Sequence, residues 1–157
     1  MNEIRTIKKV REFMFADVQR GIDGKANFMV ALALSVYTEV WGKFLEGIPR
    51  GNSPQCYKSF FRRLGKCYKK LLDDGIDVYH DVRCGLVHSY MIERTSTVNM
   101  GTGTCGITYS NGKYEFNILT YFDDFKRAVD QYVSDVQADK KLQSKLKDAL
   151  RGKPILI

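Results

Sequence analysis

The chain has 157 residues, of which 44% are hydrophobic, 12% aromatic and 27% charged, and its formal net charge is +7. This length and composition argue against a disordered chain and against a small fold that depends on disulfides or metals, because a core of sufficient size can form without them. We therefore expect one folded domain over residues 1–157.

Much of the positive charge is concentrated in two segments of the sequence. Such a distribution favours a polyanionic partner, with nucleic acid first and an anionic membrane surface second. Solvated helix faces carry similar runs of charge, so this alternative stays open. The two segments contain Lys58, Arg62, Arg63, Lys66, Lys69 and Lys70, and then Lys140, Lys141, Lys145, Lys147, Arg151 and Lys153.

The cysteines and the N-terminus bear on the compartment of the protein. Four cysteines, at positions 56, 67, 84 and 105, form no CxxC pair, so neither a zinc ribbon nor a thioredoxin-type motif is present. The N-terminus is charged from Glu3 onward and does not resemble a secretory signal. We therefore expect reduced thiols and a cytoplasmic location.

The longest apolar stretch, from Phe28 to Tyr37, is far shorter than the roughly 20 residues of a membrane span, so we expect no membrane partner.

The first half of the chain predicts four helices. Residues 2–20 carry apolar side chains at helical spacing and predict an amphipathic helix. Residues 25–46 predict a second helix, which is apolar on nearly every side at first, as at the centre of a bundle. Ser53 and Pro54 start a third helix over residues 53–72, with its basic residues opposite its apolar face. A fourth helix is expected over residues 78–93, with Asp77 as its cap.

The second half of the chain changes character after Arg94. Asn111 and Gly112 lie between two alternating runs and predict a β-hairpin at about 97–119, which must pack on the bundle or on a partner. A last helix is marked by apolar residues from Phe122 to Val136, and it frays or continues into a basic tail at about 140–157. The expected fold is all-α, a bundle of four to five helices with a small β-hairpin between the last two.

The stretch HDVRCGLVHSY, residues 80–90, contains both histidines of the chain. His80, Cys84 and His88 form a stripe of possible metal ligands along a helix, but the outer two are about 12 Å apart by helical rise, so one ion cannot easily bind all three. A nucleophilic Cys84 would lack an oxyanion hole and an orienting third group. We expect neither a metal nor a cofactor.

Arg83 and His88 offer a different chemistry. An arginine binds phosphate oxygens, and a histidine titrates close to neutral pH. Together they suffice for RNA cleavage by the RNA's own 2′-hydroxyl, because one base deprotonates this hydroxyl and the cation stabilises the charge that grows on the phosphorane. The two residues lie about 140° apart around an ideal α-helix. They can flank one groove if two copies of the helix face each other, with Gly85 allowing close backbone approach.

The segment RCGLVH, from Arg83 to His88, resembles the R-x4-H version of the Rx4–6H motif of HEPN domains, which are small helical bundles found in toxins, antiphage systems and RNA-processing nucleases. The resemblance implies a metal-independent endoribonuclease that acts as a homodimer, with Arg83 and His88 as the catalytic residues of a composite site. It covers the helical bundle, chiefly residues 1–93 and the last helix, and not the hairpin. Active members typically have a polar residue directly after the arginine, where this chain has Cys84.

We therefore predict that His88 acts as general base or acid and that Arg83 clamps the scissile phosphate. Tyr79, His80 or Tyr90 would help to position the RNA. A toxin or defence role would bring a neutralising partner protein. The alternative is a non-catalytic RNA-binding or protein-interaction module, in which Arg83 and His88 make ordinary hydrogen bonds. The basic face that would follow the RNA phosphates includes Arg62, Arg63 and Lys66.

Overall fold

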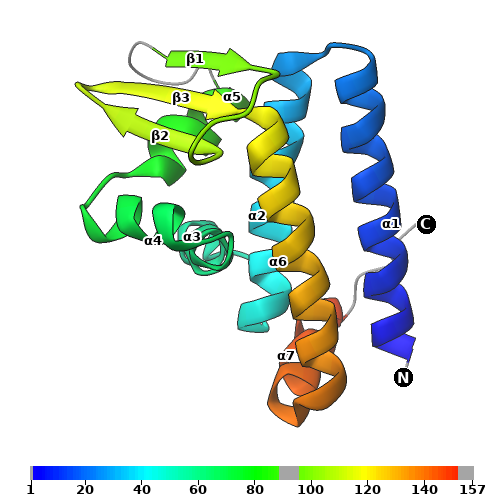
Figure 1. Cartoon of the computed structure of the whole chain (residues 1–157). Coiled ribbons are helices and arrows are strands. Elements are labelled where there is room, and N and C mark those ends of the chain that lie inside the picture. Colours follow the sequence, from blue (N-terminus) through cyan, green and yellow to red (C-terminus); the bar gives the residue numbers. More distant parts are fainter. Residues whose placement is uncertain (1, 89–95, 152–157) are drawn as a thin grey trace.

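The computed structural model describes residues 2–88 and 96–151, and this part of the chain is mostly helical with one small sheet (Figure 1). The mainly helical prediction is confirmed. The elements in chain order are α1 (Asn2–Asp23), α2 (Asn27–Glu46), α3 (Ser53–Arg63), α4 (Lys66–Asp73), the π-helical segment η1 (Tyr79–Cys84), α5 (Gly85–His88), β1 (Ser96–Asn99), β2 (Ile107–Ser110), β3 (Lys113–Asn117), α6 (Ile118–Ala138) and α7 (Lys140–Leu150).

Helix α2 lies at the centre of the bundle, as its apolar sequence predicts. It packs against α1, α3, α6 and α7. Its approach to α3 is especially close, because a Cβ atom added at Gly42 would lie only 1.8 Å from the carbonyl oxygen of Cys56. Trp41 is fully buried against Phe44 and Phe60, and it is a core residue rather than an exposed stacking platform.

Among the described helices, α2 is the one that is long and apolar enough, by length and composition, to cross a membrane. Core helices of other bundles pass the same test, so this is weak evidence. Half of the α2 window is buried inside the protein, against the four helices around it. This packing accounts for the apolar residues on the buried half of α2.

The helix predicted over residues 53–72 is in fact two helices. Gly65 has a φ of +152° and interrupts the chain between α3 and α4. The carbonyl of Leu64, at the end of α3, accepts a hydrogen bond of 2.6 Å from Arg127 of α6. The sequence pattern continues across the break because apolar residues recur at helical spacing on both sides. The predicted basic face is therefore divided between α3 and α4.

The fourth predicted helix begins as a π-helix rather than an α-helix. The N–H of Gly85 reaches back to the carbonyl of His80, five residues earlier, so the turn over residues 79–84 is wider than an α-helical turn. The angle of about 140° that an ideal α-helix predicts between Arg83 and His88 therefore does not apply here. The last part of this prediction, residues 89–93, lies outside the described residues.

The predicted hairpin is part of a three-stranded mixed sheet. Strands β2 and β3 pair antiparallel around Asn111 and Gly112, both with positive φ, which confirms the predicted turn. Strand β1, which the sequence pattern did not reveal, pairs in parallel with β3, and the strand order is β1-β3-β2. The sheet lies at the end of the bundle where α6 begins, beside α5 (Figure 1).

The last predicted helix is longer and is followed by a separate one. Helix α6 begins at Ile118, directly after β3, and ends at Ala138. Asp139 then caps α7, because its carboxylate accepts hydrogen bonds from the N–H groups of Lys141 and Leu142. Leu146 of α7 is fully buried, so the basic tail up to Leu150 is a folded part of the bundle.

The prediction of reduced thiols is wrong for two of the four cysteines. Cys67 and Cys105 form a disulfide, whereas Cys56 and Cys84 are free. The two bonded cysteines are 38 residues apart, and only the packing of the sheet on α4 brings their Cα atoms to 6.2 Å. The cytoplasmic location stays a prediction.

Candidate functional site at Arg83 and His88

Arg83 is the most constrained of the predicted catalytic residues. Its Nη2 atom lies 2.6 Å from Oε2 of Glu39 on α2, and 16% of the Arg83 side chain is exposed. The guanidinium also lies 5.6 Å from the centre of the Tyr79 ring, within the range of a cation–π contact. The Nε atom of Arg83 is buried and has no hydrogen-bond partner among the described residues. The arginine is thus held on one side by Glu39 of the distant helix α2 and on the other by Tyr79 of its own segment η1.

Glu39 organises the charges around Arg83. Its side chain is almost completely buried, and it forms a second ion pair with Lys43, one helical turn further along α2, at 3.1 Å. Burial by itself would raise the pKa of Glu39, but hydrogen bonds from Ser53 and Lys43 and the charge of Arg83 outweigh it, so the pKa lies below its usual value. Glu39 is therefore a carboxylate at neutral pH.

The cluster of Arg83, Lys43 and Glu39 carries a net positive charge, because two cations share one carboxylate. The two cations offset the cost of burying the Glu39 carboxylate. One carboxylate cannot neutralise both cations, so the cluster still attracts a further anion. Such a fixed cation can stabilise negative charge without having to reorganise. The net positive charge of the cluster therefore attracts an anion such as a phosphate group.

His88, in contrast, is exposed at the end of α5. No contact among the described residues joins it to Arg83. Its neighbour Val87 is also exposed, with 40% of its surface accessible. Within one chain, the structure therefore does not assemble Arg83 and His88 into a single site.

The three residues predicted to position RNA are placed differently. Tyr79 is buried, its ring packs on Tyr57, and burial raises its pKa. His80 is exposed, and its Nδ1 atom lies 2.8 Å from the carboxylate of Asp77. Tyr90 lies outside the described residues. Tyr79 is thus a support for Arg83, and His80 is the one of the three that the structure places at the surface.

The basic face predicted to follow RNA is largely neutralised by carboxylates. Arg62 forms an ion pair of 2.7 Å with Asp73, and Arg63 forms one with Asp135 of α6. Lys66 is exposed at the start of α4 and has no ion-pair partner among the described residues. Of these three residues, Lys66 is the one whose charge is not already paired.

The alternative chemistries gain no support from the geometry. Within residues 2–88 and 96–151, no group of three or more His, Cys, Asp or Glu side chains is placed to hold a metal ion. The thiol of Cys84 is partly buried and interacts with the hydroxyl of Tyr79. This contact gives Cys84 a packing role beside Arg83.

Glu39, Lys43 and Ser53 are site residues that the sequence analysis missed. A glutamate and a lysine four residues apart stand out within the otherwise apolar α2, and this spacing was the available signal. Their partner Arg83 could not be assigned from sequence, because it belongs to a different element. Comparison of the chain with protein-family models, with curated proteins and with solved structures finds no match.

Proposed function

We propose that the protein is a HEPN-like, metal-independent endoribonuclease that acts as a homodimer, with Arg83 as the phosphate clamp and His88 as the general base or acid. The observation that supports this proposal best is the fixed position of Arg83. Its guanidinium is held by Glu39 and Tyr79 in the same short segment that ends in the exposed His88.

The charge balance around Arg83 fits this role. Because Lys43 also pairs with Glu39, the carboxylate does not cancel the whole positive charge of the cluster. The Arg83 side chain is 16% exposed, so the cluster is not completely closed to solvent. The preorganised cation would stabilise the charge that develops on phosphorus as the 2′-hydroxyl attacks.

A second copy of the chain would complete the site. His88 and Val87 are both exposed on α5, and an isologous contact between two α5 segments would cover Val87 and bring His88 of one copy toward Arg83 of the other. In such a dimer, Arg83 and His88 would meet between the two copies rather than within one chain.

The direct test is cleavage of single-stranded RNA in the presence of EDTA. We expect cleavage by the wild type, loss of cleavage in His88→Ala and Arg83→Ala, and no cleavage of the matching DNA, which lacks the 2′-hydroxyl. Arg83→Lys serves as a matched variant, because it keeps the charge opposite Glu39 but not the forked geometry. Activity that requires a divalent metal, or equal activity in all the variants, would refute the mechanism.

The alternative is a non-catalytic RNA-binding or protein-interaction module, and one observation favours it. Arg83 is mostly buried in its ion pair with Glu39, as expected for an arginine whose role is structural. Salt-sensitive RNA binding that survives both alanine substitutions, without cleavage products, would support this alternative. The toxin or defence role, a neutralising partner protein and the cytoplasmic location remain predictions that accompany the first proposal.

A further inference from the structure

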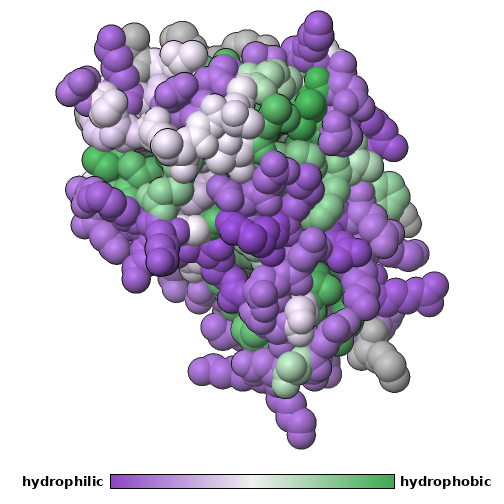
Figure 2. All heavy atoms as spheres, viewed as in Figure 1, coloured by the Kyte–Doolittle hydropathy of each residue, from purple (hydrophilic) through white to green (hydrophobic). Residues whose placement is uncertain are grey.

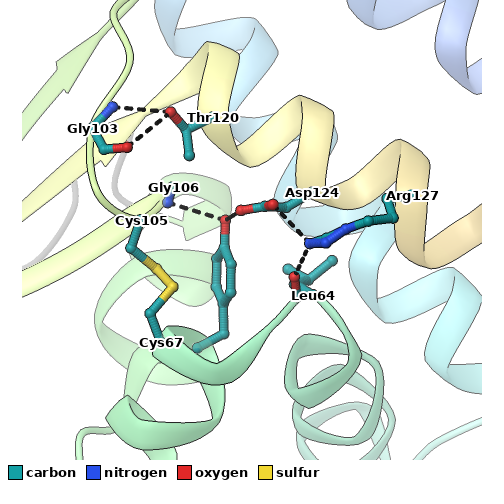
Figure 3. Close-up of polar contacts among 9 residues, drawn as sticks. Leu64, Cys67, Gly103, Cys105, Gly106, Thr120, Asp124 and Arg127 are labelled. Carbon is teal, nitrogen blue, oxygen red and sulfur yellow. Dashed lines mark hydrogen bonds and ion pairs between the residues drawn. A yellow bond between two sulfur atoms is a disulfide. The ribbon is translucent and has the colours of Figure 1, made fainter.

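The disulfide between Cys67 and Cys105 joins two parts of the fold that are 38 residues apart in sequence. Cys67 is the second residue of α4, and Cys105 lies in the loop of residues 100–106 that precedes β2. Beside it, the N–H of Gly106 donates a hydrogen bond of 3.0 Å to the hydroxyl of Tyr68, which in turn donates to Asp124 of α6 (Figure 3). The disulfide is thus the covalent part of the connection between α4 and the sheet.

The sheet in turn contacts the segment that carries Arg83. The hydroxyl of Tyr114, on β3, donates a hydrogen bond of 2.6 Å to the carboxylate of Asp81 in η1. Tyr114 is buried, and its ring packs on Tyr109 of β2, with ring centres 4.7 Å apart. A continuous set of contacts therefore runs from the disulfide through β2 and β3 to Asp81, two residues before Arg83.

The π-helical turn needs such contacts, because π-helical geometry is rare and is usually maintained by its surroundings. Contacts with distant elements hold η1 in place, and among them Tyr79 packs on Tyr57, Arg83 pairs with Glu39, and Asp81 accepts a hydrogen bond from Tyr114. The first two come from the helical bundle. The third comes from the sheet, so it forms only while the sheet keeps its position against η1.

We propose that the Cys67–Cys105 disulfide is a redox latch that controls the order of η1 and thereby the position of Arg83. A dithiol reductant opens it by thiol–disulfide exchange. One thiolate attacks Sγ of Cys67, which is more exposed than the buried Cys105, and Cys105 leaves as a thiolate. The second thiol of the reductant then displaces Cys67, so that the reductant ends as a disulfide and both cysteines as thiols.

The surroundings of Cys67 favour the second step of this opening, in which Cys67 leaves as a thiolate. The residue lies in the first turn of α4, next to Lys66, with Lys69 and Lys70 on the same short helix. Positive charge and a helix N-terminus both stabilise a thiolate. Cys105, in contrast, is enclosed by the loop and the sheet, where its carbonyl accepts a hydrogen bond from the side chain of Asn117.

The test is hydrogen exchange of the folded protein with and without dithiothreitol, followed peptide by peptide. We expect reduction to accelerate exchange in residues 79–84 and 107–116 about tenfold, with little change in α1 and in the centre of α6. Cys56→Ala removes a free thiol and should respond as the wild type does. Cys67→Ser should exchange like the reduced wild type and should not respond to dithiothreitol.

Tyr114→Phe tests whether the disulfide acts on η1 through the sheet or only stabilises the fold in general. The variant removes only the hydroxyl that bonds to Asp81. In this variant, residues 79–84 should exchange rapidly even with the disulfide intact, and reduction should add no further change there. Acceleration confined to residues 100–106, or spread evenly over the whole protein, would refute the latch. The effect on RNA cleavage rests on the proposed function, whereas the exchange measurement does not, so the two proposals can fail independently.

Discussion

Arg83 of η1 and Glu39 of α2 form a buried ion pair, with 2.6 Å between Nη2 and Oε2 and with exposed side-chain fractions of 16% and 6%. Removing one partner of such a pair leaves the other charge buried without compensation. This relationship connects the stability of the fold with the proposed catalytic arginine, and it makes Glu39 the most informative residue to change.

Glu39→Gln should lower the free energy of unfolding by about 3–5 kcal/mol, because Arg83 and Lys43 lose their shared anion while the size of the side chain is kept. Urea unfolding followed by circular dichroism measures this loss. Asp73→Asn is the matched control, since it breaks the exposed ion pair with Arg62, and it should leave stability nearly unchanged. Similar losses in both variants would contradict the special role of the buried pair.

The stabilising contribution of Glu39 should depend on pH. Its pKa in the folded protein lies below the usual value of 4.5, so its contribution is fully present above that pH and is lost as the pH falls through the folded value. The difference in unfolding free energy between wild type and Glu39→Gln should therefore shrink as the pH is lowered below 4.5. A difference that grows on acidification would show that the pKa of Glu39 is raised instead.

His88→Ala should leave the fold intact, because the histidine is exposed and has no contact with Arg83. We expect a change in unfolding free energy within about 0.5 kcal/mol. If His88 is the general base or acid, the same variant should cleave RNA roughly 10²–10⁴ times more slowly. Normal cleavage by this stable variant would exclude a catalytic role for His88.

Gly42→Ala tests the contact between α2 and α3. The added methyl group would lie 1.8 Å from the carbonyl oxygen of Cys56, so the two helices must separate, and we expect a loss of about 3 kcal/mol or more. Gly112→Ala is the control, because it has open space around it and carries only the cost of a positive φ, about 1–2 kcal/mol. Thermal unfolding of both variants gives the comparison.

Lys66→Ala should weaken RNA binding more than Arg63→Ala does. Lys66 is exposed and unpaired among the described residues, whereas the charge of Arg63 is already matched by Asp135. Loss of one phosphate contact on a single strand should reduce the slope of log affinity against log salt by roughly 0.7. Fluorescence anisotropy at several salt concentrations measures this slope. An unchanged slope in Lys66→Ala would remove α4 from the RNA surface.

Several parts of the fold could be predicted because they depend on local sequence. The amphipathic pattern from Ile4 to Val18 predicts α1, and the apolar first half of residues 25–46 predicts the central helix. Asn111 and Gly112 predict the turn between β2 and β3, since both residues adopt positive φ readily. The predicted boundaries of these elements agree with the structure to within a few residues.

Other parts depend on contacts that a local pattern does not contain. The alternation that marks β2 and β3 does not reveal β1, because parallel pairing with β3 joins strands that are not neighbours in sequence. The break at Gly65 lies within an uninterrupted apolar pattern. The π-helical turn differs from an α-helix by its hydrogen bonds, and both geometries suit the same apolar residues.

The candidate site shows the same division. Sequence by itself determined which residues could carry the chemistry, because the guanidinium and the imidazole belong to the residue types arginine and histidine. Only the tertiary structure decided that Arg83 is held by Glu39, that His88 faces solvent, and that Cys67 is joined to Cys105. Each of these outcomes requires elements far apart in the chain to pack together, and packing depends on the whole fold rather than on the spacing of a motif.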